Sequence, residues 1–156
     1  MTALLDALSG VRRLAVDTAP FIYLVEGHPQ FGPQVRSVIE HAEATEIVLV
    51  TSILTLTEVL TLPFDKGASE IADAYKALLL QTPYLRLEPI GPQVAERAAQ
   101  LRARHRLKTP DAIQLAVALE AGCEAFLTND RELRRVEEPT VLVLSEFEPP
   151  MPASSR

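Results

Sequence analysis

Tryptophan is absent from this 156-residue sequence, aromatic residues make up only 5% of it, and it contains a single cysteine, Cys123. One cysteine cannot form a disulfide within the chain, which fits the reducing environment of the cytoplasm. No apolar run approaches the roughly 20 residues that a membrane-spanning helix needs. The N-terminus also lacks the basic segment that precedes the apolar run of a signal peptide. We therefore expect a cytoplasmic protein with no membrane partner.

Positive charge is also scarce. The sequence has 15 lysines and arginines against 21 aspartates and glutamates, which gives a formal net charge of −6. A protein that coats nucleic acid regardless of sequence needs a basic surface, so the balance argues against that class. A nuclease is not excluded, because a carboxylate cluster that holds a divalent metal is itself negative and needs only a local basic rim.

Short apolar runs alternate with helical stretches along the chain. Residues 14–16, 47–50, 125–128 and 140–144 are nearly all apolar, as in parallel strands covered on both faces, whereas residues 85–89 alternate as in an edge strand. The expected helices cover residues 19–26, 53–60, 67–80, 92–104 and 110–121, with one more opened by Gly32 and Pro33. This alternation predicts a three-layer α/β/α fold around a central, mostly parallel sheet of about five strands. We expect one domain over residues 1–147 and a disordered tail over residues 148–156.

Four acidic residues fall near the ends of these elements. Asp17 follows the first strand, Asp130 follows the fourth, and Glu58 lies on the helix after the second strand. Asp111 lies in the first turn of the helix before the fourth strand, where Thr109 is expected as the N-cap. In a doubly wound sheet the first strand is usually central, and ligands bind in the crevice beside it. If the first and fourth strands are neighbours there, all four carboxylates gather at one site.

Such a cluster would repel itself strongly unless a cation neutralised it. Oxygen ligands alone suit Mg²⁺ or Mn²⁺, and the lack of paired histidines or cysteines argues against zinc. Each acid also has an ordinary structural explanation. Asp17 and Asp130 could form Asx turns, Asp111 could favour the helix N-terminus, and Glu58 could be a solvated helix position. Their common position at one end of the predicted sheet favours the metal site.

Four segments, in this order, resemble PIN-domain ribonucleases, most closely the VapC-type toxins of toxin–antitoxin pairs. They are the apolar strand ending in Asp17 and Thr18, the stretch from Ser52 to Glu58 with five residues between, residues 109–116 around Asp111, and residues 126–130. The resemblance covers roughly residues 12–145. It implies a Mg²⁺- or Mn²⁺-dependent endoribonuclease whose catalytic, metal-binding residues match Asp17, Glu58, Asp111 and Asp130. Thr128, Ser52 and Thr18 match hydroxyls expected to support that site.

The same resemblance implies an RNA substrate, a cognate antitoxin protein and a homodimer. Two alternatives stay open: a stand-alone RNA-processing PIN nuclease, and a PIN-like module that binds RNA or protein without catalysis. A haloacid-dehalogenase-type phosphatase is disfavoured because it needs a second aspartate where this chain has Ala19. A response-regulator receiver is disfavoured because residues 87–90 offer no phospho-acceptor aspartate.

Basic residues flank two of the acids. Arg104, Arg106 and Lys108 precede Asp111, and Arg131 and Arg134 follow Asp130. We expect these five residues to contact the RNA backbone. The ordinary alternative for each is a solvated position or a pair with a neighbouring acid.

Overall fold

The computed structural model describes residues 3–149, so most of the expected tail lies outside the described residues. Within that range a five-stranded sheet has the order β3-β2-β1-β4-β5, and every pair of neighbouring strands is parallel. The elements in chain order are α1 (Ala3–Ala7), β1 (Arg13–Val16), α2 (Thr18–Val25), α3 (Phe31–Thr45), β2 (Val48–Ser52), α4 (Ile53–Asp65), α5 (Ser69–Gln81), β3 (Leu85–Glu88), α6 (Pro92–His105), α7 (Thr109–Glu120), β4 (Ala125–Thr128), the 3₁₀ helix η1 (Arg131–Arg135), β5 (Thr140–Val143) and the 3₁₀ helix η2 (Leu144–Glu146). The α/β prediction is confirmed, and β3 is an edge strand as expected.

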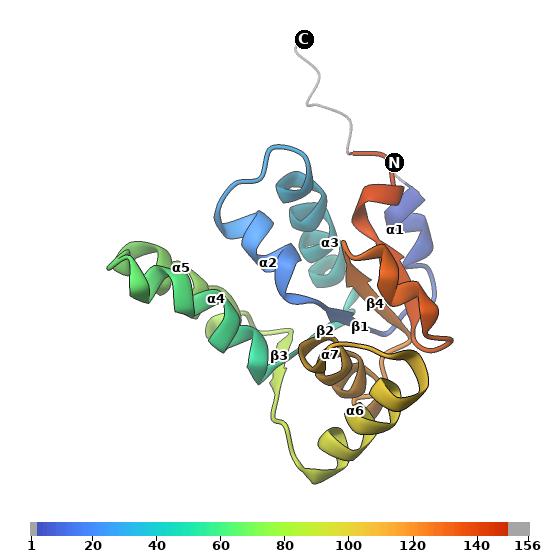
Figure 1. Cartoon of the computed structure of the whole chain (residues 1–156). Coiled ribbons are helices and arrows are strands. Elements are labelled where there is room, and N and C mark those ends of the chain that lie inside the picture. The colour runs from blue at the N-terminus through green and yellow to red at the C-terminus, as the bar shows by residue number, and fades with distance from the viewer. Residues whose placement is uncertain (1–2, 150–156) are drawn as a thin grey trace.

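Helices cover both faces of the sheet (Figure 1). Successive side chains of a strand point to opposite faces, and β1 shows the result. Leu14 and Val16 pack into a core built with α1, α2, α3 and α5, whereas Ala15 packs into a second core built with α6 and α7. The predicted three-layer arrangement is therefore confirmed. No helix among residues 3–149 is long and apolar enough to span a bilayer.

Helices α4 and α5 form a pair that extends to one side of the molecule (Figure 1). The buried Tyr75 of α5 ties the pair to α2, because its hydroxyl donates to the carboxylate of Glu26 just after that helix. The helix expected over residues 53–60 is longer in the structure. The helix continues through Pro63 to Asp65, so the missing proline N–H leaves a single gap in its hydrogen bonds rather than a stop.

The strand order places β1 at the centre of the sheet, between β2 and β4. The pairing of β1 with β4 extends one residue beyond the strand, since the Asp17 N–H donates to the Leu127 carbonyl at 2.9 Å. The carboxyl ends of β1 and β4 therefore lie side by side, which is the arrangement that a shared acidic site requires, and an acid follows each strand there.

Candidate active site

Asp17 is held at the junction of β1 and α2 by hydrogen bonds to both carboxylate oxygens. It is the N-cap of α2, and its Oδ1 accepts from the Thr18 N–H at 2.9 Å. Its Oδ2 accepts from the Thr128 hydroxyl at 2.8 Å, across from the end of β4. Asp17 therefore has a fixed orientation at the centre of the sheet edge.

The environment of Asp17 opposes its ionisation. Burial raises the pKa of its carboxyl to about 6, even though the hydrogen bonds from Thr128 and Thr18 lower it. The negative charges of Asp111 and Glu58 raise the pKa further. A carboxylate with a raised pKa beside other carboxylates is typical of a functional site.

Glu58 reaches the same region from α4. Its Oε1 accepts from the Thr18 hydroxyl at 2.7 Å. Thr18 is the first residue of α2 and directly follows Asp17. Its N–H donates to Asp17 and its hydroxyl donates to Glu58, so this one residue contacts both acids. Glu58 itself is exposed, with its backbone one turn beyond the buried Thr55.

Asp111 lies in the first turn of α7 and is half-buried. Burial raises the pKa of its carboxyl, and the charges of Asp130 and Glu58 raise it further, whereas Lys108 lowers it. The expected cap is wrong in detail. Lys108, not Thr109, occupies the N-cap and makes no side-chain cap bond, and Thr109 is the first helical residue. Asp111 is unaffected by this shift, because it still lies in the first turn.

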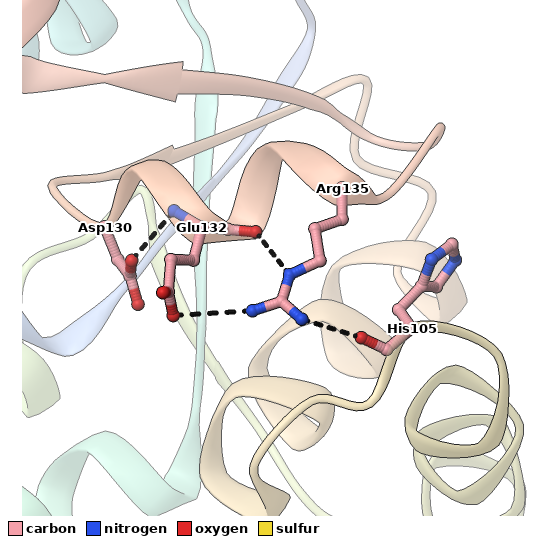
Figure 2. Close-up of polar contacts among 4 residues, drawn as sticks. All are labelled: His105, Asp130, Glu132 and Arg135. Atoms are coloured by element: carbon pink, nitrogen blue, oxygen red, sulfur yellow. Dashed lines mark hydrogen bonds and ion pairs between the residues drawn. The ribbon is translucent and has the colours of Figure 1, made fainter.

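Asp130 is the N-cap of η1, and its Oδ1 accepts from the Glu132 N–H at 2.9 Å. Figure 2 shows this contact together with Glu132 and Arg135. Arg135 donates to the Glu132 carbonyl at 3.1 Å, to its Oε2 at 3.4 Å, and to the His105 carbonyl at 3.1 Å. The guanidinium thus fastens η1 to the end of α6, and with it the position of Asp130.

Glu132 is an acid that the sequence patterns did not single out. Its charge also raises the pKa of Asp111, so it belongs to the same electrostatic region. The one local signal was the spacing of Glu132 and Arg135, which form an i,i+3 ion pair. That spacing alone does not distinguish an active-site acid from a surface pair.

The four predicted acids are linked electrostatically. Asp111 and Glu58 raise the pKa of Asp17, and Asp130 and Glu58 raise the pKa of Asp111. As the side chains stand, however, no three histidine, cysteine or acidic side chains among residues 3–149 are placed to hold a metal ion together. The exposed acids Glu58 and Asp130 accept instead from local donors, Thr18 and the Glu132 N–H. Mutual repulsion of the carboxylates favours such separate partners.

The three predicted supporting hydroxyls have different surroundings. Thr128 contacts Asp17 and also accepts from the Asp130 N–H at 3.1 Å, so it links two of the acids. Thr18 contacts Glu58. Ser52 is fully buried and caps α4, where its Oγ accepts from the Leu54 N–H at 3.0 Å. Its observed role is therefore to start the helix that carries Glu58.

The basic residues divide into two groups. Arg134 forms an ion pair with Glu146. Its guanidinium, which was expected to contact RNA, therefore already has an anionic partner. The remaining four predicted residues are exposed and form no ion pair with any of residues 3–149; they are Arg104, Arg106, Lys108 and Arg131. The three that precede Asp111, namely Arg104, Arg106 and Lys108, are all unpaired within the described part of the chain, so as a group they are freer to meet a phosphate than the two that follow Asp130.

These features define a three-layer α/β domain with an acidic centre at the carboxyl ends of its two central strands. A family model described as the PIN domain matches residues 14–139. The chain therefore belongs to the PIN domain family. The comparison with curated proteins finds no match.

Solved structures with the same fold include several VapC proteins. A VapBC2 complex of Rickettsia felis, bound to a DNA fragment from its promoter, has a TM-score of 0.69 and 14% identity, with 84% of this chain and 98% of that chain covered. DNA-bound VapBC of Salmonella typhimurium has a TM-score of 0.64 and 18% identity, with 85% and 98% covered. The sarcin–ricin-loop-cleaving toxin VapC20 of Mycobacterium tuberculosis has a TM-score of 0.58 and 22% identity, with 72% and 86% covered. At these identities the likeness shows a shared fold.

Proposed function

We propose that this PIN domain is a metal-dependent endoribonuclease that acts as the toxin of a toxin–antitoxin pair. The observation that carries the proposal is that Asp17 and Asp130 follow adjacent central strands and are linked through Thr128, with Glu58 and Asp111 contributed by flanking helices. Family membership and the shared fold with a toxin described as cleaving the sarcin–ricin loop support RNA as the substrate class.

The acidic centre fits Mg²⁺ or Mn²⁺ by its chemistry. The four proposed ligands, Asp17, Glu58, Asp111 and Asp130, offer only carboxylate oxygens, which hard divalent cations prefer. The pKa values of Asp17 and Asp111 are raised partly by the other acids, and a cation would relieve that repulsion. Glu58 and Asp130 are exposed, and their hydrogen bonds from Thr18 and the Glu132 N–H each engage one carboxylate oxygen, which leaves the other for a shared ion.

In this mechanism the chain's own groups have separate tasks. Thr128 and the Thr18 N–H fix both oxygens of Asp17, which makes Asp17 the most rigid of the four carboxylates. A divalent cation, when bound, supplies the charge that lowers the pKa of a water molecule and stabilises the phosphate. Lys108, next to Asp111, is placed to attract the phosphate backbone.

If the chain is the toxin of a toxin–antitoxin pair, it binds a cognate antitoxin protein. The structures with the same fold are toxin–antitoxin proteins, which supports a cognate antitoxin for this chain. Large apolar side chains exposed on α4 and α5, including Leu62 and Phe64, also support a protein partner. We further propose that the chain forms a homodimer, which light scattering of the purified protein tests by its molar mass.

Expression in bacteria tests the toxin assignment. We expect induction of the wild-type chain without an antitoxin to stop growth, and RNA extracted from these cells to carry new cleaved ends. The Asp17→Asn chain at the same expression level is the control and should permit growth. Equal growth arrest by both chains would contradict an enzymatic toxin, because the arrest would not depend on the acidic centre.

A further inference from the structure

A buried cluster of polar side chains lies beneath the acids. Gln114 of α7, Thr55 of α4 and Thr51 of β2 are each at most 3% exposed. The Gln114 amide nitrogen donates to the Thr55 hydroxyl at 2.7 Å and to the Thr18 hydroxyl at 3.1 Å. The cluster therefore joins three helices, α2, α4 and α7. Asp17 caps the first, and Glu58 and Asp111 lie on the other two.

The hydrogens in this cluster can be assigned from what each group is able to donate. Thr51 donates to the Val16 carbonyl at 2.8 Å, so its oxygen is free to accept from Thr55 at 2.9 Å. Glu58 can only accept as a carboxylate, so Thr18 must donate to it. The Thr18 oxygen then accepts from Gln114. The Thr55 hydroxyl lies 3.0 Å from the Thr18 hydroxyl but gives its one hydrogen to Thr51.

The orientation of the Gln114 amide determines which acceptor receives the hydrogen bond from the Thr18 hydroxyl. With the amino group toward Thr18 and Thr55, both hydroxyl oxygens receive a donor and Thr18 keeps its hydrogen for Glu58. A carbonyl in that place would compete with Glu58 for the same hydrogen. Because the cluster is buried, an unmet group there is costly, so the arrangement is held firmly.

Helical spacing explains how Gln114 can connect the helices that carry Asp111 and Glu58. Gln114 lies three residues after Asp111 on α7, and Thr55 lies three residues before Glu58 on α4, so each pair shares a helix face. Each helix thus presents an acid at the surface and a polar side chain one turn away in the interior. The interior side chains meet each other and hold the two helices in register with α2.

We propose that Gln114 is a positioning residue for Glu58, acting through Thr18, and that it sets the affinity of the centre for a divalent cation. This inference rests on the proposed function, since it assumes that Glu58 is a metal ligand. Removing the amide donors frees the Thr18 hydroxyl to turn away from Glu58. Groups that orient metal ligands typically change metal affinity by roughly 10- to 100-fold when they are lost.

The test is a calorimetric titration of the protein with Mn²⁺ in the absence of RNA. Gln114→Met keeps the volume and removes both donors, and we expect its Mn²⁺ dissociation constant to rise about tenfold or more. Gln34→Met is the matched control, because Gln34 is equally buried and also makes two hydrogen bonds, to the Phe147 and Glu148 carbonyls. We expect the control to lower the melting temperature and to leave Mn²⁺ affinity unchanged. Equal affinities for wild type and Gln114→Met would overturn the proposal.

Thr18→Val keeps the test decisive if Gln114→Met does not fold. It removes the hydroxyl through which Gln114 acts, so it should show the same loss of Mn²⁺ affinity, and unchanged affinity would overturn the proposal. Wild-type protein that binds Mn²⁺ but cuts no RNA would overturn the endoribonuclease and not the positioning role. Wild-type protein that binds no Mn²⁺ would overturn both.

Discussion

The Thr128 hydroxyl donates to Asp17 Oδ2 at 2.8 Å and so joins the carboxyl ends of the two central strands. Thr128 itself is fully buried at the end of β4. Its hydrogen bond favours the ionised form of Asp17, in opposition to the burial that raises the pKa of this carboxyl. This one hydroxyl therefore supports both the orientation and the charge of the central acid.

Replacing Thr128 by valine should lower RNA cleavage by roughly 10- to 100-fold, as expected for the loss of a group that orients a metal ligand. Valine keeps the shape of threonine and removes the donor to Asp17. The pKa of Asp17 should then rise above its present value, so the loss of activity should be larger at pH 6 than at pH 8. A pH profile of the cleavage rate measures both effects.

Thr82→Val is the control for that substitution. Thr82 also donates through its hydroxyl, to the Leu78 carbonyl at 2.6 Å, at the end of α5. Both variants lose one hydroxyl bond, but only one of these bonds involves an acid of the centre. An equal drop in cleavage for the two variants would mean that Thr128 acts through general stability alone.

The stability of the metal-free protein should depend on Asp17 in a defined pH window. Its pKa is about 6 in the folded protein against an ordinary value of 3.8, so the folded state holds this proton more tightly than the unfolded chain. This contribution to the free energy of unfolding is complete below about pH 4 and is lost as the pH rises through about 6.

Asp17→Asn removes that titration. Its free energy of unfolding should vary less between pH 4 and pH 6, and at pH 7 it should exceed the wild-type value by on the order of 1–3 kcal/mol. Urea unfolding at several pH values, in the presence of chelator, measures this difference. A variant that is less stable than wild type at pH 7 would show that the Asp17 charge is not destabilising.

Lys108 should contribute to RNA binding through its charge. It is exposed and forms no ion pair within residues 3–149, whereas Arg134 is paired with Glu146. Lys108→Gln should weaken binding of RNA to a cleavage-deficient chain and reduce the salt dependence of binding by about one unit of slope. Arg134→Gln should have a smaller effect on the affinity for RNA and on its salt dependence. The reverse order, measured by fluorescence anisotropy across a salt series, would relocate the RNA to the η1 side.

The sequence predicted the sheet, its layers and the position of the acids because those features depend on short-range patterns. Apolar runs such as residues 125–128 identify buried strands, and the acids directly follow or flank them. The cap of α7 was wrong by one residue because Lys108 and Thr109 can both precede a helix that has proline in its first turn. Pro63 did not stop α4, because the helix loses one backbone bond there and keeps its buried packing.

Two parts of the site depend on contacts between distant residues, which sequence patterns do not reveal. Arg135 is anchored to the His105 carbonyl, 30 residues earlier in the chain, and this contact fixes η1. Gln114 meets Thr55 across 59 residues, and in the sequence it is only a polar residue within the apolar stretch 112–119. Both contacts arise from the packing of α6 and α7 against the rest of the fold.

Cleavage of a mixed pool of structured RNAs is the direct test of whether the acidic centre is the active site of a metal-dependent endoribonuclease. Purified wild-type chain and Asp17→Asn are compared with Mg²⁺, with Mn²⁺ and with chelator, after the melting temperature has shown that both are folded. We expect cleavage by the wild type with either metal, none with chelator, and at most a trace with Asp17→Asn. Undiminished cleavage by Asp17→Asn, or cleavage that persists in chelator, would contradict it.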